Sequence, residues 1–144
     1  MIATADTSFL VSLYGGDVNT ASARAWMAAN GTPLLLSSAL RFETENALRL
    51  AEFRRKLTAA ERQQAFLELE SDLATGILLA RDLPAETHWA ECRRLSAAHT
   101  LSLGCRAYDI THFAGALVMG ADTFLSFDRN QRSLAAQAGL LVGP

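Results

Sequence analysis

Short, wholly apolar runs recur along the chain, and each is followed by a stretch with helical periodicity. Apolar runs without polar alternation are typical of strands that are buried on both faces. Such strands, when they alternate with helices, form a parallel sheet covered by helices on both sides. We therefore predict an α/β fold of three layers, α/β/α, around a short and mainly parallel central sheet.

The predicted elements follow one another without an internal repeat. Strands are predicted at residues 2–5, 34–36, 76–80, 122–127 and 140–142. Helices are predicted at about residues 7–14, 18–29, 39–56, 57–73, 84–101, 106–120 and 129–139. Thr58 and Glu61 have the spacing of a capping box. No linker or low-complexity tract divides the chain, so we expect a single domain over residues 1–144.

The composition is that of a folded water-soluble domain, with 50% apolar and 19% charged residues. No apolar run approaches the roughly 20 residues that a membrane span requires, and no basic region precedes the first apolar stretch. We therefore expect a cytoplasmic protein with no membrane partner. Cys92 and Cys105 lack metal-binding spacing, which favours buried free thiols. The net charge of −2 provides no bulk attraction for nucleic acid, so any such function must come from local arrangement.

Two aspartates follow predicted strands directly. Asp6 comes after the first strand and Asp128 after the fourth. Ligands of parallel α/β sheets bind beyond the carboxyl ends of the strands, where both residues would lie. Each aspartate also precedes a predicted helix, and Asp is a preferred N-cap residue. The sequence position of each is therefore explained by a cap, by a site, or by both.

Glu43 lies where its helix should be apolar. Most charged residues of the predicted helix 39–56 share one narrow arc: Arg41, Glu45, Arg49, Glu52 and Lys56. Their i,i+4 spacing favours ion pairs on a solvated face, Glu52 with Lys56 among them. Glu43 falls on the other side, with Leu40, where an ionised carboxylate is expensive without a partner.

Asp109 shows the same anomaly in the next-to-last predicted helix. It shares a stripe with Phe113, Ala116 and Gly120, and the rest of the helix surface is largely apolar, so we expect Asp109 to be buried. An Asp near a helix N-terminus is also stabilised by the helix dipole, and Arg106 stands three residues earlier as an ion-pair partner. Both interpretations remain open from the sequence.

One site would account for all four acids. Carboxylates cannot share a low-dielectric pocket at neutral pH unless a cation neutralises them. Carboxylate and water ligands without a Cys or His cluster select hard ions, Mg²⁺ or Mn²⁺. Such an ion binds phosphate oxygens, so the chemistry that fits is phosphodiester hydrolysis by a metal-activated water.

Four stretches together resemble the PIN-domain ribonucleases, most closely the toxin subunits of VapBC-type toxin–antitoxin pairs. They are "ATADTSFL", "SSALRFETENAL", "RAYDITHFAGALVMGADTFLSFDRNQ" and "AAQAGLLV". The resemblance implies a PIN fold and a metal-dependent endoribonuclease. It also implies a homodimer, a small antitoxin that blocks the pocket, and structured RNA, often tRNA, as the substrate.

The resemblance further assigns the family's acidic positions to Asp6, Glu43, Asp109 and Asp128. The first three would hold Mg²⁺ or Mn²⁺ directly or through water, and Asp128 would hold a second ion or orient the attacking water. Thr7, Ser8 and Ser126 stand where the family often has small hydroxylated residues. These hydroxyls are expected to bind water or phosphate.

Other functions fit the sequence less well. A haloacid-dehalogenase-type phosphatase needs a second Asp two residues after the first, and that position is Ser8. A phosphorylatable receiver domain needs a late Lys, and the only Lys is Lys56. An inactive PIN-like module that binds RNA or protein should lack some of the four acids, and all are present.

The three histidines are expected to play structural roles. His88 and His99 lie on one predicted helix with apolar neighbours between them. His112 follows Asp109 by three residues and is close to the predicted pocket rim, where we expect a structural hydrogen bond.

Overall fold

The computed structural model describes all residues, Met1–Pro144, and contains five strands and seven helices. The strands are β1 (Ala3–Ala5), β2 (Leu34–Ser37), β3 (Leu78–Arg81), β4 (Thr123–Leu125) and β5 (Leu141–Gly143). The helices are α1 (Thr7–Gly15), α2 (Thr20–Asn30), α3 (Ser38–Phe53), α4 (Ala59–Thr75), α5 (Ala85–Leu103), α6 (Ala107–Val118) and α7 (Arg129–Gln137). Every predicted element is present in the predicted order.

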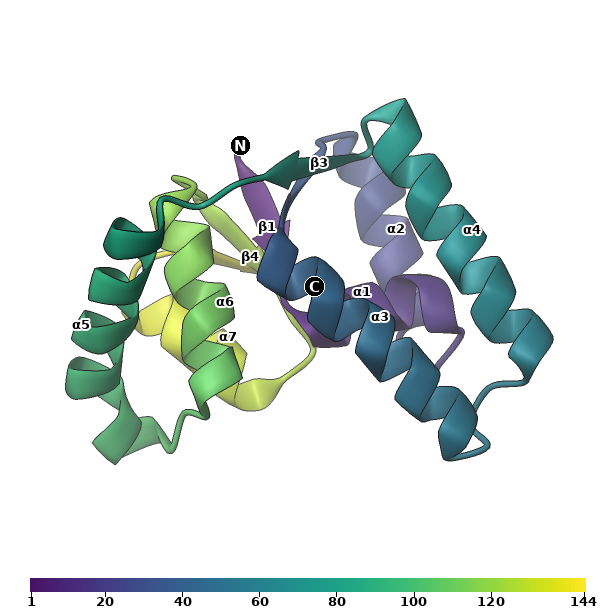
Figure 1. Ribbon diagram of the computed structural model, residues 1–144. Helices are drawn as coiled ribbons and strands as arrows, with labels where there is room; N and C mark the ends of the chain where they lie inside the picture. The colour runs from purple at the N-terminus through teal and green to yellow at the C-terminus, as the bar shows by residue number, and fades with distance from the viewer.

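The five strands form one sheet in the order β3-β2-β1-β4-β5, and every neighbouring pair is parallel. The first connections run outward from β1 through β2 to β3, and the later ones run outward through β4 to β5. Since parallel crossovers are right-handed, these two series must place their helices on opposite faces. Figure 1 shows this, with α1–α4 on one side of the sheet and α5–α7 on the other. The predicted three-layer α/β/α architecture is confirmed.

Each face of the sheet has its own apolar core. Phe9, Leu10 and Leu48 belong to the core beneath α1–α4 and are almost fully buried. Phe113 and Phe124 belong to the core beneath α5–α7, where their rings meet edge to face at 5.3 Å between centroids. Alternate residues of β4 serve the two cores, because successive side chains of a strand point to opposite faces.

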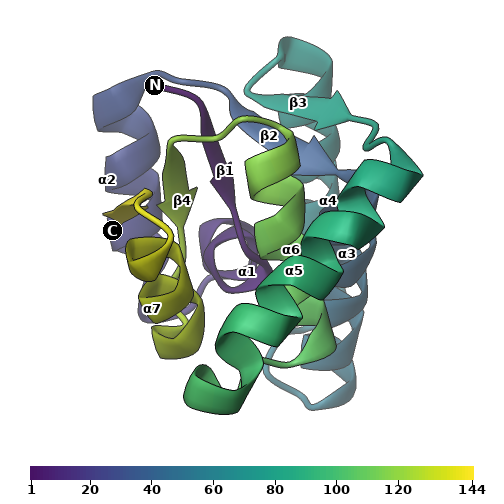
Figure 2. The same ribbon diagram turned by 90° about the vertical axis from the view of Figure 1, so that its left-hand side faces the viewer.

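Successive strands are added in one direction from β1 to β3 and in the other direction from β4 to β5, so the switch point of the sheet lies between β1 and β4. Their register pairs Ala3 with Thr123 and Ala5 with Leu125, so the two strands end level with each other. Figure 2 shows them side by side in the middle of the sheet. In open α/β sheets a ligand site forms at such a switch point, beyond the carboxyl ends of the strands.

Local capping explains where several helices begin. Ser37 is the N-cap of α3, and its hydroxyl accepts a hydrogen bond from the Leu40 N–H at 3.2 Å. Thr58 and Glu61 form the predicted capping box at the start of α4. Both arrangements satisfy amide groups that have no partner within the helix. Helix α4 therefore starts at the position that the capping-box spacing indicates.

The predicted end of the third helix is wrong by one turn. Helix α3 ends at Phe53 and not at Lys56, because the chain turns at Arg55, which has a left-handed φ of 58°. Lys56 therefore leaves the helix face, and Glu52 pairs with Arg62 of α4 instead of Lys56. The remaining solvated face is as predicted, with Glu45 between Arg41 and Arg49.

The cysteines and the apolar character of the helices were also predicted from the sequence. Both cysteines are free and buried, as predicted. None of the helices combines the length and the apolar character that crossing a bilayer would demand.

Replacing Ser37 with Ala is expected to lower the free energy of unfolding by about 1 kcal/mol, the usual effect of losing an N-cap side chain. Urea denaturation followed by circular dichroism measures this change. Ser38→Ala is the matched control, because Ser38 is exposed and the same change there should stay within about 0.5 kcal/mol. Equal losses in the two variants would contradict the capping role of Ser37.

Candidate functional site

Asp6 is buried at the carboxyl end of β1 and is only 3% exposed. Its backbone N–H continues the sheet by donating to the Leu125 carbonyl at 2.9 Å. One carboxylate oxygen accepts from the Phe9 N–H at 3.0 Å and from the Ser8 hydroxyl at 2.6 Å, and the other accepts from the Ser126 hydroxyl at 2.6 Å. Asp6 is therefore the N-cap of α1, and hydroxyl and amide donors engage both of its oxygens.

Asp128 lies across the switch point from Asp6, just beyond β4. It is the N-cap of α7, and its Oδ1 accepts from the amides of Asn130 at 2.9 Å and Gln131 at 3.0 Å. Ser126 connects the two acids, because its hydroxyl donates to Asp6 and accepts from the Asp128 N–H at 2.9 Å. The parallel register thus brings residues 120 positions apart into one hydrogen-bonded group.

Asp109 lies in the first turn of α6 and is 7% exposed, so its predicted burial is confirmed. Arg106 surrounds it with three donors: its backbone N–H at 3.0 Å and Nε at 3.1 Å reach Oδ2, and Nη2 at 3.2 Å reaches Oδ1. The Gln131 amide adds a longer contact with Oδ1 at 3.3 Å. The predicted ion pair with Arg106 is therefore present, and Gln131 links Asp109 to the start of α7.

Glu43 lies on α3 and is half-buried, with 33% of its side chain exposed. Its Oε2 accepts from the Thr7 hydroxyl at 2.6 Å and from the His112 Nε2–H. These contacts join the first residue of α1 to α3 and α6. The Glu43 side chain is therefore partly shielded from solvent, and its carboxylate has polar partners on α1 and α6.

His112 is the residue that the sequence left out of the candidate site. Its side chain is 2% exposed, and its Nδ1 has no hydrogen-bond partner. The predicted structural hydrogen bond exists, but its acceptor is Glu43, a candidate metal ligand 69 positions away. The available signal was the i,i+3 spacing of Asp109 and His112, which makes their side chains neighbours on α6.

The hydroxyl groups that the resemblance singled out all contact candidate acids. Ser8 and Ser126 donate to Asp6, and Thr7 donates to Glu43. Such second contacts orient carboxylates that act as ligands. In this structure the three hydroxyls orient acids; their expected contact with water or phosphate stays a prediction.

The local electrostatics differ between the two ends of the site. Burial raises the pKa of Asp6, hydrogen bonds from Ser126 and Ser8 partly offset that rise, and the nearby Asp128 adds to it. Burial also acts to raise the pKa of Glu43, but hydrogen bonds from His112 and Thr7 outweigh it and leave this pKa below its ordinary value. Asp6 is thus a buried carboxylate without a cationic partner.

A divalent metal needs several ligands within reach of one point. No three His, Cys, Asp or Glu side chains are placed closely enough in this structure to hold one. The donor chemistry nevertheless fits a hard cation, because the four acids supply only carboxylate oxygens. The Gln131 Oε1 is a further oxygen donor, buried beside Asp109 without a partner. The donor set therefore fits Mg²⁺ or Mn²⁺, and a metal held by three of these side chains would require them to move closer together.

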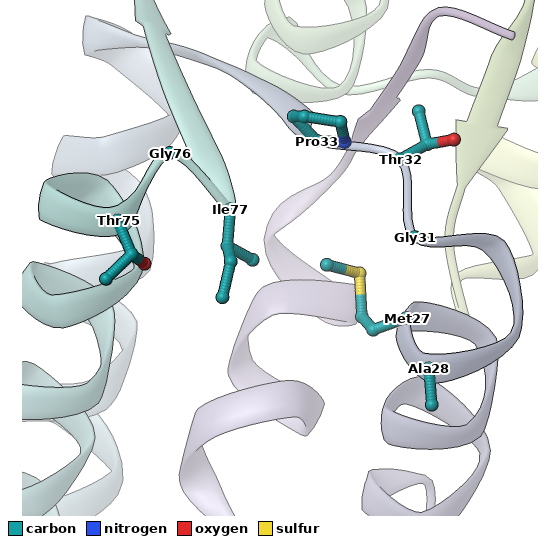
Figure 3. Close-up of a pocket in the computed structure, with 8 residues that line it drawn as sticks. All are labelled: Met27, Ala28, Gly31, Thr32, Pro33, Thr75, Gly76 and Ile77. Atoms are coloured by element: carbon teal, nitrogen blue, oxygen red, sulfur yellow. The ribbon is translucent and has the colours of Figure 1, made fainter.

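A separate cavity of about 400 Å³ lies at the opposite edge of the sheet, where β2 and β3 begin. Figure 3 shows Met27 and Ile77 reaching toward the same space, with Pro33 above. Its lining contains no titratable side chain, so it offers nothing to bind a metal or to transfer a proton.

Comparison with known families places this geometry in context. The model of the PIN domain family matches residues 3–137, nearly the whole chain. The chain belongs to the PIN domain family. PIN domains are nucleases, and these nucleases generally use divalent metals.

Two solved structures share the PIN fold of this chain. VapC20 of Mycobacterium tuberculosis, described as a sarcin-ricin loop cleaving toxin, has a TM-score of 0.69 and 19% identity over 99% of both chains. PAE2754 of Pyrobaculum aerophilum has a TM-score of 0.64 and 17% identity over 99% of this chain and 89% of that one. No curated protein matches the sequence.

Asp6→Asn is expected to stabilise the metal-free PIN domain. Because folding raises the pKa of Asp6, the stability linked to this group is complete below the unfolded pKa and is lost as the pH rises through the folded pKa. At neutral pH the neutral amide removes that cost, so the Tm in EDTA should rise. Thermal denaturation followed by circular dichroism measures it.

Asp122→Asn is the matched control. Asp122 is exposed, and a hydrogen bond from Thr123, with another from the Ile2 N–H, lowers its pKa, so neutralising it should slightly lower the Tm. A fall in Tm for both variants would show that Asp6 does not carry an uncompensated charge.

Proposed function

We propose that this protein is a metal-dependent endoribonuclease and the toxin of a toxin–antitoxin pair, with Asp6, Glu43, Asp109 and Asp128 as its catalytic and metal-binding acids. The main support is membership of the PIN domain family together with the positions of Asp6 directly after β1 and of Asp128 just beyond β4. Asp6 and Asp128 share Ser126, while Gln131 joins Asp109 to the N-terminus of α7. Arg106 interacts electrostatically with both Glu43 and Asp128, and this links Glu43 to the other three acids.

The role of each residue follows from its contacts. Asp6 is the most firmly oriented of the proposed ligands, because three donors fix its carboxylate and its backbone N–H is held by the sheet. Glu43 stays ionised at neutral pH, since its pKa is lowered by His112 and Thr7 against the effect of burial. Asp128, at the rim, is suited to a second ion or to orienting the attacking water.

A divalent cation bound by these residues would neutralise the clustered charge and lower the pKa of the water that attacks the phosphodiester. Because Asp6 is buried, bulk water is excluded around its carboxylate, and the attraction between this carboxylate and a bound cation would be stronger than in solvent. The chain itself supplies the orientation of the carboxylates and the counter-charges around them.

The substrate in this proposal is structured RNA, either tRNA or a sarcin-ricin loop of the kind that VapC20 cleaves. A small antitoxin and a second copy of the chain complete the proposed assembly. Exposed apolar side chains support a protein partner: Phe42 and Phe53 on α3 are 59% and 83% exposed, and Trp89 on α5 is 52% exposed. In this proposal, the surface that binds a protein partner would be built from these large exposed apolar groups.

An inactive binding module is the second candidate. The observation that favours it is the absence of three acidic side chains arranged around one point. The presence of all four acids, each oriented by specific donors, favours the nuclease. A cleavage assay separates the two functions directly.

The purified protein is expected to cleave total RNA with Mg²⁺ or Mn²⁺ and to be inactive in EDTA. Asp6→Asn and Asp109→Asn should each reduce the cleavage rate by about a hundredfold or more, the typical effect of losing one preorganised electrostatic contact. Gel analysis of end-labelled RNA, with mapping of the cut sites, measures the rate and identifies the target.

Asp122→Asn is the control in the same assay, because Asp122 is an exposed acid on the opposite edge of the sheet, before β4. It should cleave at the wild-type rate. Equal activity in wild type and Asp6→Asn, or cleavage that persists in EDTA, would overturn the proposed mechanism.

A further inference from the structure

Arg106 makes an unusual contact for a residue at the edge of an acidic site. Its guanidinium binds both oxygens of Asp109, through Nε at 3.1 Å and Nη2 at 3.2 Å. The Asp109 side chain is 10% exposed, whereas the Arg106 side chain is 77% exposed. The guanidinium therefore covers a buried carboxylate from the solvent side.

The charge of Arg106 is felt by three of the four candidate acids. Asp109 raises the pKa of Arg106 most, and Asp128 and Glu43 add to the rise. Glu43 in turn is stabilised as an anion partly by Arg106. Arg106 thus offsets the negative charge of Asp109, Asp128 and Glu43 when no metal is bound.

This ion pair is easy to exchange. An exposed guanidinium is screened by water, so such a pair contributes little stability. The backbone N–H of Arg106 and the side chain of Gln131 also donate to Asp109, and both contacts remain when the guanidinium leaves. Asp109 would keep its orientation while its solvent side became free.

We propose that Arg106 is an exchangeable counter-ion, which occupies Asp109 in the metal-free protein and binds an RNA phosphate once a divalent metal has taken its place. This inference rests on the proposed nuclease function. A carboxylate oxygen that accepts from the guanidinium cannot donate the same lone pair to a metal, so the two compete. The released guanidinium stays at the N-terminus of α6, beside the site, where its planar fork suits a phosphate.

The proposal predicts opposite effects on metal and on RNA. In Arg106→Gln, Mn²⁺ should bind the RNA-free protein about fivefold more tightly, equivalent to about 1 kcal/mol, because its competitor is gone. With saturating Mn²⁺, the same variant should show a KM for RNA raised by roughly three- to tenfold, with little change in kcat. Isothermal titration with Mn²⁺ alone and steady-state cleavage of RNA measure the two effects.

Arg93→Gln is the matched control. Arg93 is exposed on α5 and has no ion pair, so the variant loses the same charge away from the site. Its Mn²⁺ affinity and KM should equal those of the wild type. High salt should shrink the gain in Arg106→Gln, because screening weakens an exposed pair.

The outcomes distinguish this inference from the function on which it rests. Wild-type or weaker Mn²⁺ binding by Arg106→Gln overturns the competition, while Mn²⁺-dependent cleavage by the wild type would leave the nuclease intact. Tighter Mn²⁺ binding with an unchanged KM overturns the phosphate contact. If the wild type neither binds Mn²⁺ nor cleaves RNA, both the inference and the proposed function are wrong.

Discussion

The parallel pairing of β1 with β4 is the constraint on which the rest of the structure depends. Its register ends both strands at the same level, so Asp6 and Ser126 become neighbours although 120 positions separate them. The chain leaves β1 toward one face of the sheet and β4 toward the other, which makes the space beyond these two strand ends the switch point of the sheet. A slip of one residue would turn every side chain of β4 to the other face and would separate Ser126 from Asp6.

A buried carboxylate at this edge creates a cost that the surrounding residues reduce. Amide and hydroxyl donors occupy both oxygens of Asp6, yet burial still raises its pKa because no cation lies against it. Asp109 has the Arg106 guanidinium instead, and Glu43 accepts a hydrogen bond from His112. Capping and candidate chemistry are therefore not competing explanations of Asp6. The same carboxylate that begins α1 also lies in the acidic group.

Much of the fold could be predicted from the sequence, because its signals are local. Apolar runs indicated the strands, and caps such as Thr58 with Glu61 indicated where helices begin. The predicted end of α3 was wrong because Arg55 turns the chain in a left-handed conformation. The sequence has no Gly or Pro at that point to indicate a turn. The burial of Asp109 followed from helical periodicity, whereas the pairing of Glu43 with His112 did not. That contact joins two helices that are far apart in the sequence, and periodicity describes one helix at a time.

The sequence by itself determined the order of strands and helices, the parallel sheet, the positions of Asp6 and Asp128 after strands, and Glu43 and Asp109 as the anomalous charges on helices. These properties depend on neighbouring residues and on helical or strand spacing. Only the tertiary structure decided the partners of those acids: Ser126 for Asp6, His112 for Glu43, and Gln131 together with Arg106 for Asp109. The physical reason is that charge balance in a buried site depends on distances across the sheet. The packing of the two helical layers sets those distances, and no local pattern encodes them.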